Sequence, residues 1–131
     1  MPKEYHLPLE VERGIYLINR GEYYKAHEAL EFAWGREKAN VRQLLQGLVQ
    51  VSVMLYHLER DNQKGAQKLV LKALENIRPF EDMPSKLEIP LLIDDLTNLA
   101  AQLNAGNTDE PVKTPVHPIR LHLRHTDSDA S

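Results

Sequence analysis

Residues 41–60 constrain the fold of this 131-residue chain more than any other segment. An α-helix advances about 100° per residue, so a helical wheel shows which side chains share a face. On that wheel apolar residues cover most of the circumference: Val41, Leu44, Leu45, Leu48, Val51, Leu55 and Leu58. Such a helix is buried at the centre of a fold, because almost every side of it would expose apolar side chains to water. The segment therefore predicts a bundle built around this helix.

The rest of the first 105 residues has helical rather than strand periodicity. We expect helices over residues 9–19, 22–34, 41–60, 63–77 and 91–103. Gly21 and Gly35 are expected to end the first two, and Asn40 to cap the third. The predicted fold class is all-α: a single-domain bundle of about five helices. Because the connection after residue 34 is short, 22–34 and 41–60 should form a central antiparallel pair.

The expected domain organisation is a helical bundle domain over residues 1–106 followed by a partly disordered tail over 107–131. Prolines in the tail forbid a continuous helix. Leu121 and Leu123 alternate with charged residues, so a short extended piece that packs on the body is expected there. The chain end is polar and is expected to be disordered.

Composition excludes several classes of function. The chain has no cysteine, which excludes disulfide scaffolds, cysteine nucleophiles, zinc fingers and iron–sulfur clusters. The formal net charge of −3 gives no sign of a nucleic-acid partner. No apolar stretch is long enough to span a membrane and the N-terminus lacks a signal-peptide core, so we expect a soluble, cytoplasmic protein. Lys64, Lys68 and Lys72 should form a solvated helix face.

Two polar stripes stand beside the apolar faces of the central pair. They consist of Tyr24, His27, Glu28 and Glu31 in the first helix, and Arg42, Gln46, Gln50 and His57 in the second. In an antiparallel hairpin His57 should lie opposite residues 24–28, Glu31 near Gln50, and Arg42 near the hairpin turn. The neighbouring aromatic residues are expected in the core: Tyr23, Phe32, Trp34 and Tyr56.

One interpretation of this cluster is a metal site. His27, Glu31 and His57 would bind a divalent ion such as Zn, Mn, Fe or Ni, since imidazole and carboxylate are good ligands for these metals. Glu28 would be the general base. Tyr24, Arg42, Gln46 and Gln50 would complete the binding surface. The segment 27–31 reads HExxE, so it lacks the second histidine of the HExxH zinc proteases.

The residues leave two other interpretations open. In a structural network, Glu28 or Glu31 would pair with Arg42, and the glutamines would bond the histidines. Glu28→Gln and His57→Ala should then each cost about 1–3 kcal/mol. In the second alternative the cluster belongs to a non-enzymatic binding module that recognises a partner or a small molecule. A bundle this small also gains core by pairing, so a homodimer is expected in that case.

Three ordered motifs carry a family resemblance. Residues 21–34 (GEYYKAHEALEFAW) resemble a G-x-[YF]-[YF]-x-A-H-E-x-[LW]-E-x-x-W signature. Residues 45–57 (LQGLVQVSVMLYH) resemble an LQGLIQ-x-A-x-x-x-H block, and residues 62–66 (NQKGA) an N-x-x-G-A element. The chain thus resembles, over residues 9–77, a small bacterial and archaeal family known as domain of unknown function 309.

The resemblance implies an all-helical fold. Members of that family are sometimes labelled predicted metal-dependent hydrolases. The characteristic polar positions carried over by motif are His27, Glu28, Glu31, Gln46, Gln50 and His57. Gly47, inside a buried helix, should permit close helix approach at a cost of about 1 kcal/mol. Ser52 stands where the family usually has a small apolar residue, and the tail lies outside the resemblance.

Overall fold

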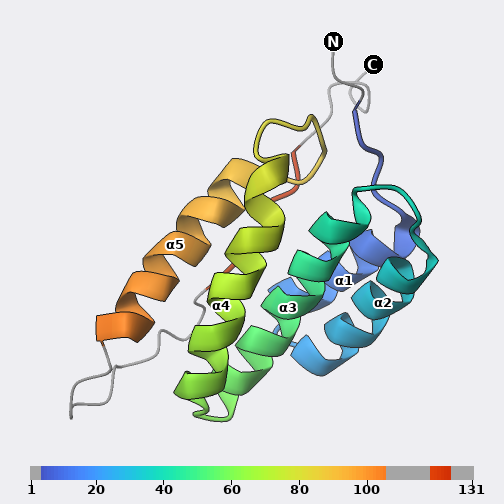
Figure 1. Cartoon of the computed structure of the whole chain (residues 1–131). Helices are drawn as coiled ribbons and strands as arrows, with labels where there is room; N and C mark the ends of the chain where they lie inside the picture. The colour runs from blue at the N-terminus through green and yellow to red at the C-terminus, as the bar shows by residue number, and fades with distance from the viewer. Residues whose placement is uncertain (1–3, 106–118, 125–131) are drawn as a thin grey trace.

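The computed structural model describes residues 4–105 and 119–124, which form a bundle of five α-helices (Figure 1). The helices are α1 (Leu9–Asn19), α2 (Tyr23–Arg36), α3 (Arg42–Glu59), α4 (Gln63–Ile77) and α5 (Ile89–Ala105), and a short 3₁₀ helix, η1 (Arg78–Phe80), follows α4. Two isolated β-bridges join loop segments. Within the described ranges there is no β-strand. The predicted all-α single-domain bundle is confirmed.

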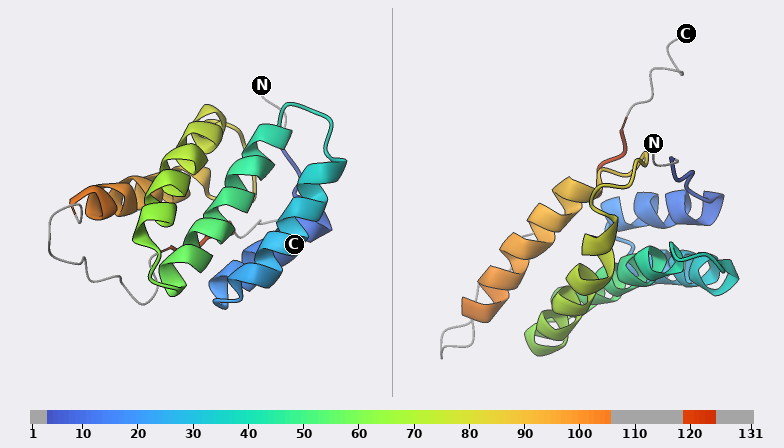
Figure 2. Two further views of the ribbon diagram at one scale, coloured as in Figure 1. Left: turned by 60° about the horizontal axis from the view of Figure 1, so that its bottom comes forward. Right: turned by 45° about the horizontal axis from the view of Figure 1, so that its top comes forward.

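Successive helices pack on one another, so that α3 lies between α2 and α4 (Figure 1). α1 packs on α2, and α5 packs on α4 (Figure 2). α2 and α3 are antiparallel, as predicted. Both helices have a neighbour on each side, and the most extensive contact of α3 is with α4 rather than with α2.

A glycine in α3 explains how closely α4 approaches. A Cβ atom at Gly47 would lie 2.5 Å from Cγ1 of Ile77 and 3.3 Å from the carbonyl oxygen of Ala73. Ile77 is fully buried, so its side chain fills the space that a larger residue at position 47 would need. The predicted role of Gly47 in close helix approach is confirmed, and α4 is the helix that approaches.

Two helices extend further than the sequence predicted. Gly35 does not end α2 but lies inside it. A helical glycine costs only about 1 kcal/mol, and Ala33, two residues earlier on the same helix, is buried in the core. α5 begins at Ile89 rather than Leu91, with Pro90 in its first turn. Proline fits there because the first N–H groups of a helix have no partner within it.

The predicted cap of α3 is also wrong. Val41 occupies the N-cap position, and no side chain caps the helix there. The carboxylate of Glu37 instead accepts hydrogen bonds from the backbone N–H groups of Lys38 and Ala39, at 3.1 Å each. This bonding orders the connection between α2 and α3 without the side chain of Asn40.

Residues 119–124 run as an extended segment against the bundle. The Asn19 side chain donates from Nδ2 to the carbonyl of Leu121 at 2.8 Å, and its Oδ1 accepts from the Leu121 N–H at 2.9 Å. Leu123 forms a β-bridge with Leu87, and Ile119 is buried. The expected extended piece is confirmed. The predicted boundary at 106/107 stays a prediction, and the end of the chain lies outside the described residues.

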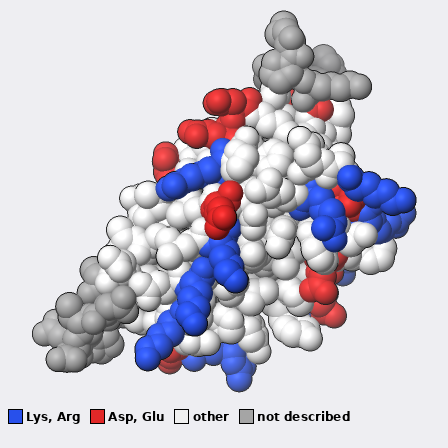
Figure 3. Space-filling view, viewed as in Figure 1, with Lys and Arg blue, Asp and Glu red and all other residues white. Residues whose placement is uncertain are grey.

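The outer face of α4 is basic. Lys64, Lys68 and Lys72 are all exposed, and Figure 3 shows basic side chains along this helix. The prediction of a solvated lysine face is confirmed.

Candidate functional site

The polar stripe of α2 faces outward and contains one close side-chain pair. His27 is half-buried, and its Nε2 atom lies 2.6 Å from Oε2 of Glu31, one helical turn away. Glu31 itself is exposed. Glu28 is exposed as well, and it forms no ion pair with any residue in the described ranges. The stripe therefore presents an imidazole–carboxylate pair beside a free carboxylate.

The polar line of α3 does not stay together. Arg42 stacks on Trp34, with its guanidinium carbon 4.0 Å from the centre of the indole ring. Gln50 turns toward α4, where its Oε1 accepts from Nδ2 of Asn76 at 2.8 Å. Gln46 is exposed. Four positions that share a helical stripe are thus divided among different neighbours, and His57 lines a hollow together with Tyr24 and His27 of the α2 stripe.

The pairings expected of a structural network are absent from the described part of the chain. Neither Glu28 nor Glu31 forms an ion pair with Arg42, and no hydrogen bond joins Gln46 or Gln50 to a histidine. The predicted pairings fail because Arg42 stacks on the indole ring of Trp34 and α4 supplies Asn76 as the partner of Gln50. The proximity of Glu31 to Gln50 stays a prediction.

A hollow of about 200 Å³ lies between α2 and α3, and we call it the aromatic pocket. Six side chains line it: Tyr23, Tyr24, His27, Val53, Tyr56 and His57. The ring centre of Tyr24 lies 6.0 Å from that of His27 and 6.0 Å from that of Tyr56. The ring centre of Tyr56 lies 6.4 Å from that of His57. His57 is therefore opposite residues 24–28, as predicted.

Two residues that line the pocket, Tyr23 and Tyr56, are predicted core residues. Tyr23 is buried, which confirms part of that assignment, but its ring also lines the pocket. Burial, and then the nearby charge of Glu59, raises the pKa of Tyr23 above the ordinary 10.0. Tyr56 is half-buried and tilted against Tyr24. Helical periodicity shows which side chains face the interior. It does not show where two packed helices leave a pocket between their inward side chains.

Phe32 was also expected in the core, and this prediction is wrong. Its side chain is 52% exposed, because it extends from the outer face of α2. It borders a shallow hollow of about 390 Å³ that also touches Tyr24, His27, Glu28 and Glu31. Since Tyr24 and His27 line the aromatic pocket too, the two hollows share a wall. Acidic side chains therefore stand directly outside the aromatic pocket.

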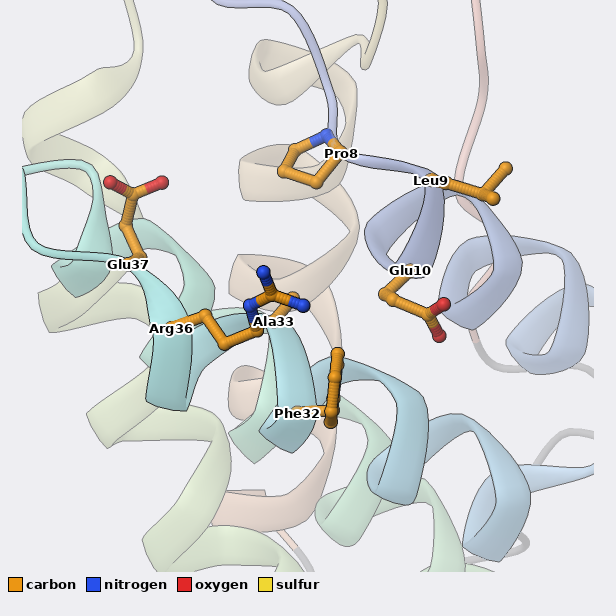
Figure 4. A pocket seen from close by; sticks show the side chains of 7 residues that line it. All are labelled: Pro8, Leu9, Glu10, Phe32, Ala33, Arg36 and Glu37. Atoms are coloured by element: carbon orange, nitrogen blue, oxygen red, sulfur yellow. The ribbon is translucent and has the colours of Figure 1, made fainter.

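A further hollow, of about 400 Å³, lies at the other end of α2, where it meets the start of α1 (Figure 4). Pro8, Leu9 and Glu10 line it from one side, and Phe32 and the end of α2 from the other. Leu9 is 78% exposed. The exposed apolar residues of this hollow are surface features that sequence periodicity did not indicate.

Asn62 and Gly65, two of the fixed positions of the third motif, lie beside the His57 ring. Nδ2 of Asn62 lies 3.2 Å from Nδ1 of His57. Oδ1 of Asn62 accepts from the Gly65 N–H at 3.0 Å and so caps α4. A Cβ atom at Gly65 would lie 2.7 Å from Nδ2 of Asn62 and 3.2 Å from Cδ2 of His57. The second and third motifs therefore meet at one point, which sequence spacing alone did not reveal.

The described residues do not fit a preformed metal centre. Within residues 4–105 and 119–124, no group of three or more histidine, aspartate or glutamate side chains is arranged to hold an ion. His27 and Glu31 are in contact with each other, whereas His57 is bonded to Asn62. Two of the three predicted ligands therefore pair with each other, and the third has a different partner.

Comparison with known proteins agrees with these motifs. Residues 11–69 match the family described as Domain of unknown function (DUF309). This DUF309 match covers α1, α2, α3 and the first part of α4, which are the elements that form the aromatic pocket and the cap on His57. The resemblance inferred from the three motifs is confirmed.

A curated relative matches 60 residues of the chain. It is an uncharacterized protein of Aquifex aeolicus (strain VF5), 32% identical over 60 residues. The alignment covers 45% of this chain and 18% of the relative, so the matched segment is a small part of that longer protein. In the described part of this chain, no helix combines the length and apolar character needed to cross a membrane.

Proposed function

We propose that this protein is a non-enzymatic binding module whose ligand site is the aromatic pocket. One observation carries the proposal: aromatic rings from α2 and α3 line a hollow of about 200 Å³ between these helices. Pockets that bind small molecules are typically apolar with a few placed polar groups. Here the three tyrosines and Val53 supply the apolar walls, and His27 and His57 supply the polar groups.

Two side chains that could do chemistry, Ser52 and His27, have other partners. Ser52, the serine of α3, is fully buried and donates its hydroxyl to the carbonyl of Val49 at 2.7 Å. His27 is paired with Glu31 rather than with a nucleophile. A general base and a nucleophile must lie within hydrogen-bond reach of each other. This arrangement favours recognition over catalysis.

A screen of small aromatic compounds by protein-observed NMR tests the proposal. Compounds that bind should shift the ring resonances of Tyr56 and His57, and Tyr24→Ala should weaken their binding. Tyr16→Ala is the matched control, because Tyr16 on α1 is as exposed as Tyr24 (58% against 59%) and does not line the pocket. A screen without hits, or equal losses in both variants, would contradict the proposal.

The metal-dependent hydrolase is the competing prediction, and metal analysis of protein purified without a histidine tag tests it. We expect less than one equivalent of Zn, Mn, Fe or Ni, and no rise in melting temperature when these ions are added. Stoichiometric metal that is lost in His57→Ala would favour the hydrolase and contradict the binding module.

The same proposal includes a cytoplasmic location and a homodimer. Pairing would cover exposed apolar side chains at the hollow between α1 and α2, chiefly Leu9 and Phe32. Analytical ultracentrifugation should then show a concentration-dependent dimer that Phe32→Glu weakens. A monomer at every concentration would contradict this part of the proposal.

A further inference from the structure

The orientation of the Asn62 amide identifies the hydrogen-bonding character of His57. The backbone N–H of Gly65 can only donate, so the atom 3.0 Å away must be the amide oxygen of Asn62. The other atom of the amide, Nδ2, can only donate. It lies 3.2 Å from Nδ1 of His57, which must therefore accept.

A neutral imidazole carries one proton, and the nitrogen that accepts is the one without it. With Nδ1 accepting, the proton of His57 is on Nε2. In the described part of the chain Nε2 has no hydrogen-bond partner. A Cβ atom at Gly65 would lie 3.2 Å from Cδ2 of the ring, so the first turn of α4 also borders the ring. The free polar group of this ring is thus an N–H donor.

We infer that the aromatic pocket selects ligands with an aromatic body and a neutral hydrogen-bond acceptor, such as a ketone or amide oxygen, which would accept from Nε2–H of His57. This inference rests on the proposed binding function and adds the class of ligand. A carboxylate is disfavoured because Glu28 and Glu31 lie just outside the pocket. A metal ion is also disfavoured, since a ligating nitrogen cannot carry a proton.

The side chain of Asn62 allows the inference to be tested without unfolding the protein. In Asn62→Asp the carboxylate can still cap α4, because aspartate and asparagine are similarly good N-caps. A carboxylate only accepts, so Nδ1 of His57 would have to donate and Nε2 would become an acceptor. Asn62→Ser keeps a capping oxygen but is too short to reach the ring.

The first measurement is a long-range ¹H–¹⁵N correlation spectrum of the histidine rings, followed through a pH titration without ligand. In the wild-type protein the neutral His57 ring should have a protonated Nε2 and an unprotonated Nδ1. In Asn62→Asp the two assignments should exchange. A protonated Nδ1 in the wild-type protein would overturn the inference, whatever the pocket binds.

The second measurement compares the affinities of three probes of similar size: acetophenone, ethylbenzene and benzylamine. The wild-type protein should bind acetophenone roughly five- to tenfold more tightly than ethylbenzene, as expected for one hydrogen bond. Asn62→Ser should lose this preference, and Asn62→Asp should favour benzylamine.

The results separate the two proposals. If none of the three probes shifts the Tyr56 or His57 resonances, the proposed binding site fails, and the ligand class fails with it. If the probes bind but acetophenone and ethylbenzene bind equally, the site stands and the inferred ligand class is overturned.

Discussion

The two faces that α3 presents to its neighbours are built from residues of different size. Toward α4, Gly47 has no side chain, so Ile77 packs directly on the α3 backbone. Toward α2, Tyr56 meets Tyr24 with 6.0 Å between ring centres, and a hollow remains beside the rings. Small residues let two helices close, whereas large rings with polar tips leave space between them.

Polar contacts follow the same division. On the face toward α4, which we call the closed face, the side chains of Gln50 and Asn76 form a hydrogen bond with each other. On the face toward α2, which we call the open face, Asn62 bonds to Nδ1 of His57, and the other ring nitrogen has no partner among the described residues. A satisfied pair contributes to stability, and a free donor beside a hollow is suited to binding. We therefore expect substitutions on the closed face to change stability and those on the open face to change binding.

The largest expected effect is that of Gly47→Ala. The new methyl group would lie 2.5 Å from Cγ1 of Ile77, and overpacking of this kind costs about 1–3 kcal/mol. Chemical denaturation should show the loss. Gly35→Ala is the matched control, because it makes the same change in a helix with no atom within 4 Å and should gain about 0.5–1 kcal/mol. Equal effects of the two substitutions would contradict the close packing of α4 on α3 at Gly47.

Gln50→Ala should have the next largest effect. It removes the 2.8 Å bond to Asn76 and should lower the free energy of unfolding by about 1 kcal/mol. Binding of aromatic fragments should stay unchanged, because Gln50 faces α4. Should fragment binding fall more than stability, Gln50 would belong to the open face.

The open face should also give the protein a pH dependence. Because the pKa of Tyr23 is raised, the folded protein keeps a proton that the unfolded chain releases above pH 10.0. The stabilisation is therefore complete below pH 10.0 and is lost as the pH rises through the higher folded pKa. The free energy of unfolding of Tyr23→Phe should fall less steeply above pH 10.0 in urea titrations. Identical slopes would mean that the hydroxyl is not shielded.

Glu28→Gln should have the smallest effect on stability, within about 0.5 kcal/mol of the wild-type protein. Glu28 is exposed and forms no ion pair in the part of the chain that the structure describes. Thermal melts in the presence of a chelator measure the difference. A decrease of about 1–3 kcal/mol in the free energy of unfolding would instead support the interpretation of the polar cluster as a structural network.

Much of the site could be predicted because it lies on regular helices. The spacing of His27 and Glu31 predicts that they share a face, and the antiparallel hairpin predicts that His57 lies opposite them. The fate of Gln50 and Arg42 could not be predicted in this way. Their long side chains reach more than one neighbour, and the choice depends on where Asn76 and Trp34 lie in space.

The sequence by itself determined the helices and their inward faces, because apolar spacing and turn residues act over a few neighbouring positions. It also determined the close approach at Gly47, since only a contact with another backbone or side chain explains a glycine inside a buried helix. Tertiary structure decided which helix makes that approach, and that α2 and α3 enclose a hollow. It also placed Asn62 and Gly65 against His57. These features depend on distances between separate elements, which the periodicity of any single helix does not contain.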